Sequence, residues 1–358
     1  MALKVEIPDS EIGFTEFVQF YDQVYAYRDV RWPAAVELQI PILTGKSPFA
    51  QGRKMRPFLV RAGSDILARA VAVVDDRYNR HWQERLGHIV MFEAMPDTRE
   101  ATKLLIDAAC EWLEAQGTEA ARAGFGLLEF PFVIDDYTSL PPEIARHNPA
   151  YYHRLLKDAG FESEKGWVDY KIEVQPELVA RWESALEGVR RAGYDIVPLK
   201  DVPETLRVPD FTATWSDTFK THWGFTPLSE DEVSLLLEGF AEAGVLDTSV
   251  LAYKDGAPVG FLFVVPEVTA TAVLKPDRVL QESEKLNLLA IGVREAARGR
   301  GVNLAMAAYS YLELVRRGVQ YVSYTLVLDD NWPSRRTGEK LGAFVCANYM
   351  VYRRNFRR

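Results

Sequence analysis

Residues 288–303 read LLAIGVREAARGRGVN, and they carry most of the functional information in the sequence. An apolar run ends at Val293, a short charged stretch follows, and the tetrapeptide RGRG at 298–301 leads into an alanine-rich segment typical of a helix. A strand, a glycine loop and a helix start direct several free backbone N–H groups at one point. Such a point binds phosphate, because the helix dipole adds to the N–H groups. The stretch therefore predicts a phosphate site near position 300.

The composition is that of a globular chain long enough for two domains, at 358 residues. Its net charge of −9 argues against a general nucleic-acid binder and suits small cationic substrates. Only Cys110 and Cys346 are present, which excludes a disulfide scaffold and a cysteine zinc site and fits a reducing cytoplasm. The five histidines, at 81, 88, 147, 153 and 222, show no metal-ligand spacing, so we expect no metal.

No apolar run reaches the roughly 20 residues that a membrane helix needs. The first residues, MALKVEIPDSEIGF, lack the apolar core of a signal peptide. We therefore expect a cytoplasmic protein with no membrane partner.

The first half of the chain predicts helices over 14–25 and 97–117 and a short helix from 148. Strands are predicted over 57–62, 66–74, 88–93, 126–130 and 168–174. Asp97 and Glu100 have the spacing of a capping box, and Asn148 with Pro149 is typical of a helix start.

The second half follows a helix predicted over 176–193. Strands are predicted over 194–198, 249–253, 259–265, 320–328 and 344–352, and helices over 211–223, 230–242, 302–317 and 331–341. Asp255-Gly256 predicts a hairpin turn between two of the strands.

The two halves end alike. Asn148 precedes a predicted helix that Gly160-Phe161 follows, and Asn331 precedes one that Gly342-Ala343-Phe344 follows. This favours an internal duplication with a period near half the chain. Chance is the alternative, because asparagine caps and glycine ends are common.

The glycine loop is not a nucleotide loop of two familiar kinds. No Gly-Lys-Ser/Thr follows, so it is not a Walker A loop. Leu304 stands where the third glycine of a dinucleotide fingerprint would be, and its side chain would obstruct close helix–strand packing.

The segment 293–303 instead resembles the acyl-CoA loop of the GNAT acyltransferase superfamily, whose usual form is V-x-P-x-x-[RQ]-x-x-G-x-[GA]. Asn331 with Gly342 and Phe344 is similar to the motif that follows in that family. The first half resembles a degenerate module, because 95–100 has no glycine, and Asp97 and Glu100 would repel a pyrophosphate.

The resemblance implies an α/β (α+β) fold of two tandem GNAT-like domains, each a mixed, mostly antiparallel sheet flanked by helices. It divides the chain into a degenerate domain at 1–175, a connecting helix at 176–193 and an acyltransferase domain at 194–358. Three departures stand out: Glu295 replaces a common proline, Asn303 replaces Gly or Ala, and Gly338 stands where a catalytic tyrosine is common.

By resemblance, the acyl–pantetheine arm bonds the backbone of one strand and the pyrophosphate bonds the loop amides. The implied cofactor-binding residues are Ile291, Val293, Arg298, Gly299, Arg300, Gly301, Val302, Asn303 and Asn331. Arg298 and Arg300 are alternatively solvated loop arginines, and Asn331 alternatively only caps its helix.

The catalytic groups are less visible. Glu284 precedes the loop strand, where the superfamily often places a general base, and Tyr324 on the next strand is a candidate acid. Trp215, Trp223 and Phe225 lie where the family's helices line the acceptor groove; ordinary core packing is the alternative for each.

The resemblance implies an N-acyltransferase that moves an acyl group from acetyl-CoA, or another acyl-CoA, to an amine of a small molecule or peptide by direct attack. Gly338 keeps open a non-catalytic acyl-CoA- or metabolite-binding protein. Transfer from aminoacyl-tRNA is a third possibility, which the net charge of −9 disfavours.

Overall fold

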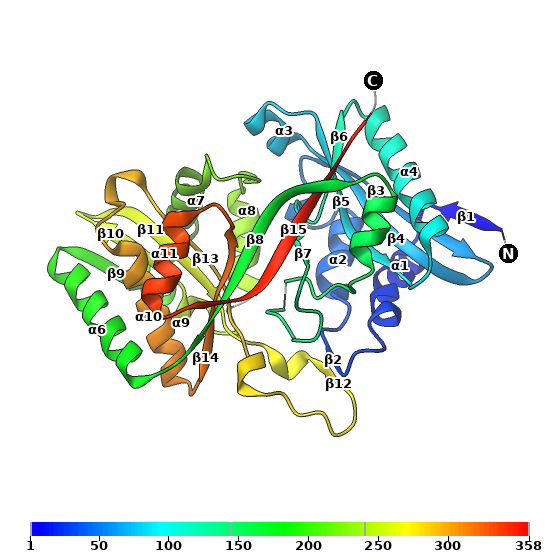
Figure 1. The fold of residues 1–358 in the computed structure, drawn as a ribbon. Coiled ribbons are helices and arrows are strands. Elements are labelled where there is room, and N and C mark those ends of the chain that lie inside the picture. The colour runs from blue at the N-terminus through cyan, green and yellow to red at the C-terminus, as the bar shows by residue number, and fades with distance from the viewer. Residues whose placement is uncertain (1, 144, 240, 357–358) are drawn as a thin grey trace.

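The computed structural model describes residues 2–143, 145–239 and 241–356. Its strands form a nine-stranded sheet in the order β1-β3-β4-β5-β6-β15-β8-β14, with β7 on β15, a four-stranded sheet in the order β13-β11-β10-β9, and the pair β12-β2. Two lobes lie side by side, one at each end of the molecule (Figure 1).

The first half contributes these elements: β1 (Leu3–Glu6), α1 (Glu11–Val24), β2 (Val30–Arg31), α2 (Val36–Leu43), β3 (Arg53–Ala62), β4 (Asp65–Asp75), α3 (Asp76–Trp82), β5 (Leu86–Ala94), α4 (Arg99–Ala115), β6 (Ala120–Ala123), β7 (Phe132–Val133), α5 (Tyr152–Asp158) and β8 (Glu162–Glu173). Helix α6 (Pro176–Arg191) follows.

The second half contributes β9 (Tyr194–Pro198), α7 (Glu204–Phe219), α8 (Glu230–Gly239), α9 (Val245–Thr248), β10 (Val250–Lys254), β11 (Ala257–Val265), β12 (Val273–Leu274), β13 (Leu288–Val293), α10 (Val302–Arg316), β14 (Tyr321–Leu328), α11 (Trp332–Leu341) and β15 (Phe344–Asn355).

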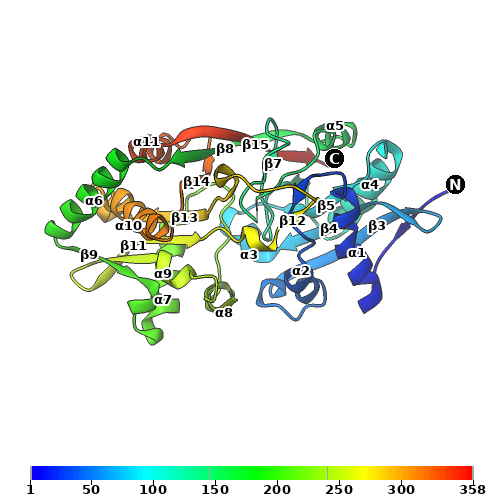
Figure 2. The ribbon, with the colours of Figure 1, turned by 90° about the horizontal axis from the view of Figure 1, so that it is seen from below.

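Alternation along the strands of the four-stranded sheet gives it two apolar faces. Val250 and Leu262 pack with α6 and α10, whereas their neighbours Leu251 and Phe261 pack with α7 and α8. Because successive side chains of a strand point to opposite faces, the sheet is covered on both sides. Figure 2 shows α6 and α10 on one side of this sheet and α7 on the other.

The two halves exchange a strand. The long strands β8 and β15 run together from one lobe to the other (Figure 1). The far end of β15 also pairs with β6 of the first half, Tyr352 opposite Ala123. Helix α6 occupies the segment predicted as the connection, but the division of the chain at 175 and 193 stays a prediction, since β15 lies in the first half's sheet.

A buried ionic cluster joins the halves. Glu232 of α8 accepts from Arg53 and Arg77 at 2.6–2.7 Å, and Arg53 also pairs with Asp75 at 2.7 Å. The Glu232 side chain is 0% exposed. Removing one partner of such a cluster leaves an uncompensated buried charge, so these contacts hold the second half to the first.

The segment 266–287 leaves the second half and crosses onto the first. Its strand β12 pairs with β2, and Lys275 pairs with Asp29 at 2.9 Å. Leu280 packs against Trp32 of the first half. The segment returns to the second half at Leu288, where β13 begins.

Several predicted elements are confirmed. The strand at 194–198 is β9, and Asp255 and Gly256 turn between β10 and β11 with φ of 52° and 78°. The predicted helix over 230–242 is α8 as far as Gly239; Phe240 lies outside the described residues.

Three local predictions for the first half are wrong. Thr98, not Asp97, is the N-cap residue of α4, and its side chain bonds the Met95 carbonyl rather than a first-turn amide. Asn148 does not cap α5 but exchanges hydrogen bonds with the backbone of Val133 at 2.8 and 3.2 Å. The segment 126–130 is not a strand but a tight turn closed by one β-bridge between Gly126 and Glu129, and the nearest preceding strand is β6, which ends at Ala123.

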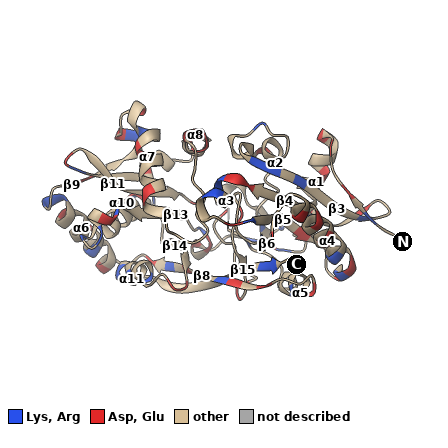
Figure 3. Cartoon of the chain, turned by 90° about the horizontal axis from the view of Figure 1, so that it is seen from above, with Lys and Arg blue, Asp and Glu red and all other residues tan. Residues whose placement is uncertain are grey.

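Lysines and arginines are interspersed with acidic residues over both lobes in the view of Figure 3. Among the described residues, no helix is long and apolar enough to cross a membrane.

Candidate functional site

Strands β13 and β14 run side by side without forming a backbone ladder. Side chains join them at one end: Asn287 accepts from the Ser323 amide at 2.9 Å, and the Thr325 hydroxyl bonds both the amide and the carbonyl of Leu289, at 2.9 and 3.1 Å. Beyond Leu289, no hydrogen bond between described residues links the two strands. The strands therefore part on the side towards the glycine loop.

The free edge of β13 presents backbone groups to this gap. The Arg294 amide donates to the Val259 carbonyl of β11, so the alternation of an antiparallel ladder turns the N–H and C=O groups of Ile291 and Val293 the other way, towards β14. Arg298 Nε bonds the Val293 carbonyl at 3.1 Å. In the described part of the chain, no partner satisfies the Ile291 amide and carbonyl on that side.

The glycine loop follows directly. Gly299 and Gly301 have φ of 75° and 80°, which favours glycine, and 298–300 is exposed. Gly301 is the N-cap residue of α10 and has no side chain to bond the first turn. The amides of Val302, Asn303 and Leu304 therefore have no intrahelical acceptor, and they form the kind of N-terminus that binds anions.

The side chains predicted around the loop have different places. Those of Arg298 and Arg300 are exposed, whereas Val302 is buried in the core against α6 and the sheet. Asn303 donates to the Thr337 hydroxyl of α11 at 2.7 Å, so its side chain ties α10 to α11 and leaves its amide at the helix end.

A cavity of about 330 Å³ opens beyond the parted strands, between the two halves. The predicted substrate residues Trp215, Trp223 and Phe225 all line it. The first half contributes Phe125 and Trp167 to the same walls. The aromatic lining residues are Phe49, Phe125, Phe130, Trp167, Phe211, Trp215, Phe219, Trp223, Phe225, Phe263 and Tyr324.

Asn331, Ser334 and Tyr324 lie together where the cavity meets the parted strands. Asn331 caps α11 by accepting from the Ser334 amide at 3.3 Å, and the residue also lines the cavity. The Tyr324 hydroxyl bonds the Ser334 hydroxyl at 2.8 Å. Burial raises the pKa of Tyr324 to about 12, so the phenol keeps its proton at neutral pH.

Gly338 has a packing explanation. A Cβ at this position would lie 3.2 Å from Cδ1 of Tyr324, which is closer than ordinary contact. The Tyr324 ring thus occupies the space beside the helix position where the sequence resemblance leads us to expect a tyrosine.

Glu284 is not at the cavity. Its carboxylate accepts from the Gln281 amide at 2.9 Å, in a capping box, and pairs with Arg278. Glu284 lies on the segment that crosses to the first half and is absent from the described cavity walls. The structure therefore brings Ile291, Asn331, Tyr324 and the three aromatic residues together at the cavity, whereas the glycine loop lies past the end of β13 and Glu284 lies elsewhere.

Three further ionisable side chains line the cavity and were not predicted. Arg53 is committed to Asp75 and Glu232, and Glu129 accepts from the Met91 amide and pairs with Arg146. His222 is the third. Its sequence neighbourhood, FKTHWGF, contains the aromatic residues, but a lone histidine has no pattern that separates a site residue from a core residue.

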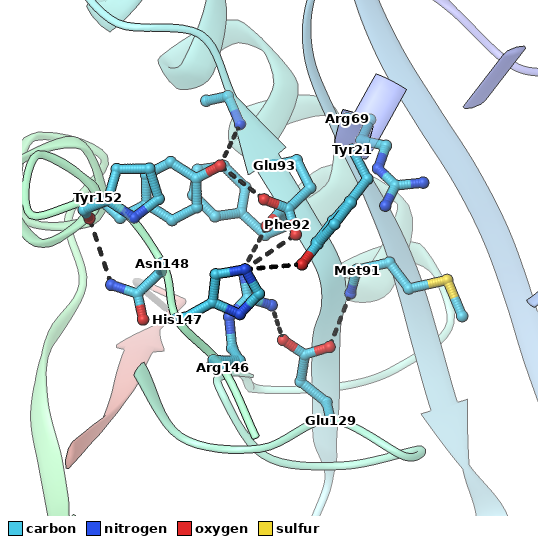
Figure 4. Close-up of polar contacts among 12 residues, drawn as sticks. Tyr21, Arg69, Met91, Phe92, Glu93, Glu129, Arg146, His147, Asn148 and Tyr152 are labelled. Atoms are coloured by element: carbon cyan, nitrogen blue, oxygen red, sulfur yellow. Dashed lines mark hydrogen bonds and ion pairs between the residues drawn. The ribbon is translucent and has the colours of Figure 1, made fainter. Parts of the chain in front are cut away.

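The equivalent gap in the first half is filled. Strand β5 pairs with β6 only as far as Ile89, and the next backbone groups are taken by side chains: the Met91 amide by Glu129 and the Phe92 carbonyl by Arg146 at 2.7 Å (Figure 4). Tyr152 adds a bond to Glu93 at 2.7 Å. These side chains occupy the edge that β13 leaves open in the second half.

Several solved structures have a similar overall fold. A tandem GNAT protein from the clavulanic acid biosynthesis pathway matches 99% of this chain and 98% of its own, with a TM-score of 0.60 at 14% identity. The chain has the tandem GNAT fold. A GCN5-related N-acetyltransferase from Sphaerobacter thermophilus matches 99% of this chain and 96% of its own, with a TM-score of 0.55 at 14% identity.

A third match is the glucosamine N-acetyltransferase region of a fungal multi-domain GH3 β-N-acetylglucosaminidase, with a TM-score of 0.61 at 16% identity. This chain spans 38% of that protein's length. No family model matches the sequence, and no curated protein matches it. At these identities the neighbours establish the fold alone. Among the described residues, no group of three or more His, Cys, Asp or Glu side chains could hold a metal ion.

Proposed function

We propose that the protein is an acyl-CoA-dependent N-acyltransferase whose cofactor site lies in the second half of the chain. The observation that carries the proposal is the open edge of β13 leading to the uncapped N-terminus of α10. The unpaired backbone N–H and C=O groups of β13 can hydrogen-bond the amide-rich pantetheine arm, and the first-turn N–H groups of α10 can bind the pyrophosphate.

In this proposal the diphosphate of coenzyme A bonds the amides of 299–304, and exposed Arg298 and Arg300 add charge. The pantetheine arm bonds Ile291 and Val293, with Arg298 giving up the Val293 carbonyl. Asn331 reaches the arm near its sulfur end, where it lines the cavity. The filled gap of the first half leaves that half without a second acyl-CoA site.

The chemistry of the transfer is largely positioning, because a thioester is already activated towards an amine. An amine bound in the cavity attacks the thioester carbonyl, the C–N bond forms, and the C–S bond breaks with its electron pair on sulfur. We assign Tyr324 the role of protonating that sulfur, because its phenol is protonated, is hydrogen-bonded to Ser334, and lines the cavity beside Asn331. Transfer of acetyl is the simplest case.

Two measurements test the proposal on the full chain. Isothermal titration with acetyl-CoA should show a single site per chain. A thiol-release assay with acetyl-CoA and a panel of primary amines should show turnover with at least one amine. Binding without thiol release on any amine would support a non-catalytic acyl-CoA-binding protein instead, and absence of binding would refute the site.

A further inference from the structure

We infer that the cavity between the two halves accepts a monoamine with an aromatic or apolar body, and that His222 removes the proton of this amine. The inference rests on the proposed function, since the amine is the acceptor of the acyl group. It adds the chemical class of the acceptor and a base that replaces Glu284.

The walls of the cavity set the class of molecule that fits. At about 330 Å³ it has the size of a small-molecule site, and its rings come from both halves: Phe125 and Trp167 from the first, Trp215, Trp223 and Phe225 from the second. Such walls stabilise an apolar body by burial and ring stacking. A sugar amine would lose water from its hydroxyls with few partners to replace it.

The charges at the cavity exclude a second positive group on the substrate. Two charged side chains line it, and both already have partners: Arg53 pairs with Glu232, and Glu129 pairs with Arg146. No unpaired carboxylate lies among the described lining residues to receive another ammonium. Polyamines and basic peptides would therefore bind weakly, because their additional ammonium groups would lose water without gaining a carboxylate partner.

His222 is the lining group that is free to accept a proton. Its Nδ1 lies 3.2 Å from the Trp223 carbonyl, and a carbonyl oxygen only accepts, so Nδ1 carries the proton and Nε2 carries the lone pair. Nε2 has no hydrogen-bond partner among the described residues. The ring lies 5.2 Å from that of Phe219 and 5.9 Å from that of Trp167, between centroids.

The environment keeps His222 neutral before substrate binds. Burial lowers its pKa, the bond to the Trp223 carbonyl partly opposes this, Asp330 raises the pKa and Lys165 lowers it. Lys165 and Asp330 are themselves an ion pair, and Asp330 directly precedes Asn331 of the site. The same apolar surroundings lower the pKa of a bound ammonium, which brings the two groups closer to matched basicity.

The proton balance of the reaction then closes. The ammonium passes one proton to Nε2 of His222 and attacks as a neutral amine. When the C–N bond has formed and the C–S bond has broken, the second proton leaves nitrogen and the thiolate is protonated from Tyr324, which regains a proton from the product nitrogen. His222 returns its proton to solvent. The products are an amide, coenzyme A and one released proton.

The experiment compares wild type and His222→Asn in thiol release from acetyl-CoA with tryptamine, glucosamine and spermidine. The Asn side chain can still donate to the Trp223 carbonyl, so a packing role survives and the base does not. We expect tryptamine to have the highest kcat/KM in wild type. We expect His222→Asn to lower kcat with tryptamine by about 100-fold or more, with unchanged acetyl-CoA affinity. In the plot of kcat against pH, the fall at acidic pH should disappear in His222→Asn. Added imidazole should partly restore the activity of His222→Ala.

The outcomes separate the two levels of inference. Turnover by wild type with an unaltered rate and pH profile in His222→Asn removes the base assignment and leaves the proposed function standing. A higher kcat/KM for spermidine or glucosamine than for tryptamine would refute the aromatic or apolar acceptor class and would also leave the proposed function standing. Absence of thiol release with all three amines and with the wider panel above refutes the proposed function and the inference together.

Discussion

Replacing Gly301 by glutamate tests the central contact, the one between the N-terminus of α10 and the diphosphate. Gly301 has φ of 80°, and a Cβ there would find its nearest neighbour, Val189 Cγ2, at 3.5 Å, which is an ordinary contact. Any side chain at this position therefore fits sterically but costs about 1–2 kcal/mol of backbone strain. Gly301→Gln pays the same strain and adds no charge, so it is the matched control.

The difference between the two variants is electrostatic. A carboxylate about 5 Å from the two charges of a diphosphate is repelled by about 2 kcal/mol at the dielectric constant of water and about 7 kcal/mol at an effective value of 20. The lower figure alone corresponds to roughly a 30-fold weaker affinity. We expect Gly301→Glu to bind CoA at least that much more weakly than Gly301→Gln, by isothermal titration at low salt, with the gap narrowing as salt is added.

A second pair of variants controls for strain elsewhere. Gly256 in the β10–β11 turn has φ of 78° and open space around its Cβ position, so glutamate and glutamine there should leave CoA affinity unchanged. Equal affinities for Gly301→Glu and Gly301→Gln would mean that no phosphate lies at this helix end, and the cofactor site would have to be placed elsewhere.

Three further predictions concern stability and chemistry. Glu232→Gln should lower the free energy of unfolding by about 3–5 kcal/mol in denaturant titrations, because buried Arg53 and partly buried Arg77 lose the carboxylate that they share and Arg53 keeps only the Asp75 carboxylate. Lys103→Ala, in an exposed pair, should lower it by less than about 1 kcal/mol, and equal losses for the two variants would contradict the role of the cluster. Burial raises the pKa of Asp169 from 3.8 to about 7, so only the unfolded chain loses this proton between these values; its contribution to stability should fall as pH rises through that window, and Asp169→Asn should flatten the dependence in thermal scans at a series of pH values. Tyr324→Phe should lower kcat by about 100-fold without changing CoA affinity, since only the hydroxyl bonded to Ser334 is lost; an unchanged kcat would leave sulfur protonation to water.

The sequence predicted the second half better than the first, for a physical reason. Around 288–303 the strand, the glycines and the helix are adjacent in the chain, so local preferences and the fold agree. Asn148 illustrates the opposite case. Its residue type is typical of a cap, but its amide bonds Val133, a partner that only the tertiary structure supplies.

The same distinction explains the candidate site. The loop, Asn331 and the aromatic residues at 215–225 could be predicted because each belongs to a local pattern. Glu284 is close to β13 in sequence, but the crossing segment 266–287 carries it away to a capping box. His222 meets Asn331 and Tyr324 only across the cavity, and Phe125 and Trp167 reach it from the other half, so no spacing in the chain encodes their proximity.

The placement of β15 has a consequence for how the protein is made. Strand β15 lies between β6 and β8 but is synthesised last. Until residues 344–355 have left the ribosome, β6 and β8 each have an unpaired edge, although the strands from β1 to β8 were synthesised long before. Exposed edges of this kind recruit strands from other chains. The edges of β6 and β8 therefore stay unpaired during the synthesis of nearly half of the chain. A chain truncated after residue 175 would keep both edges unpaired permanently.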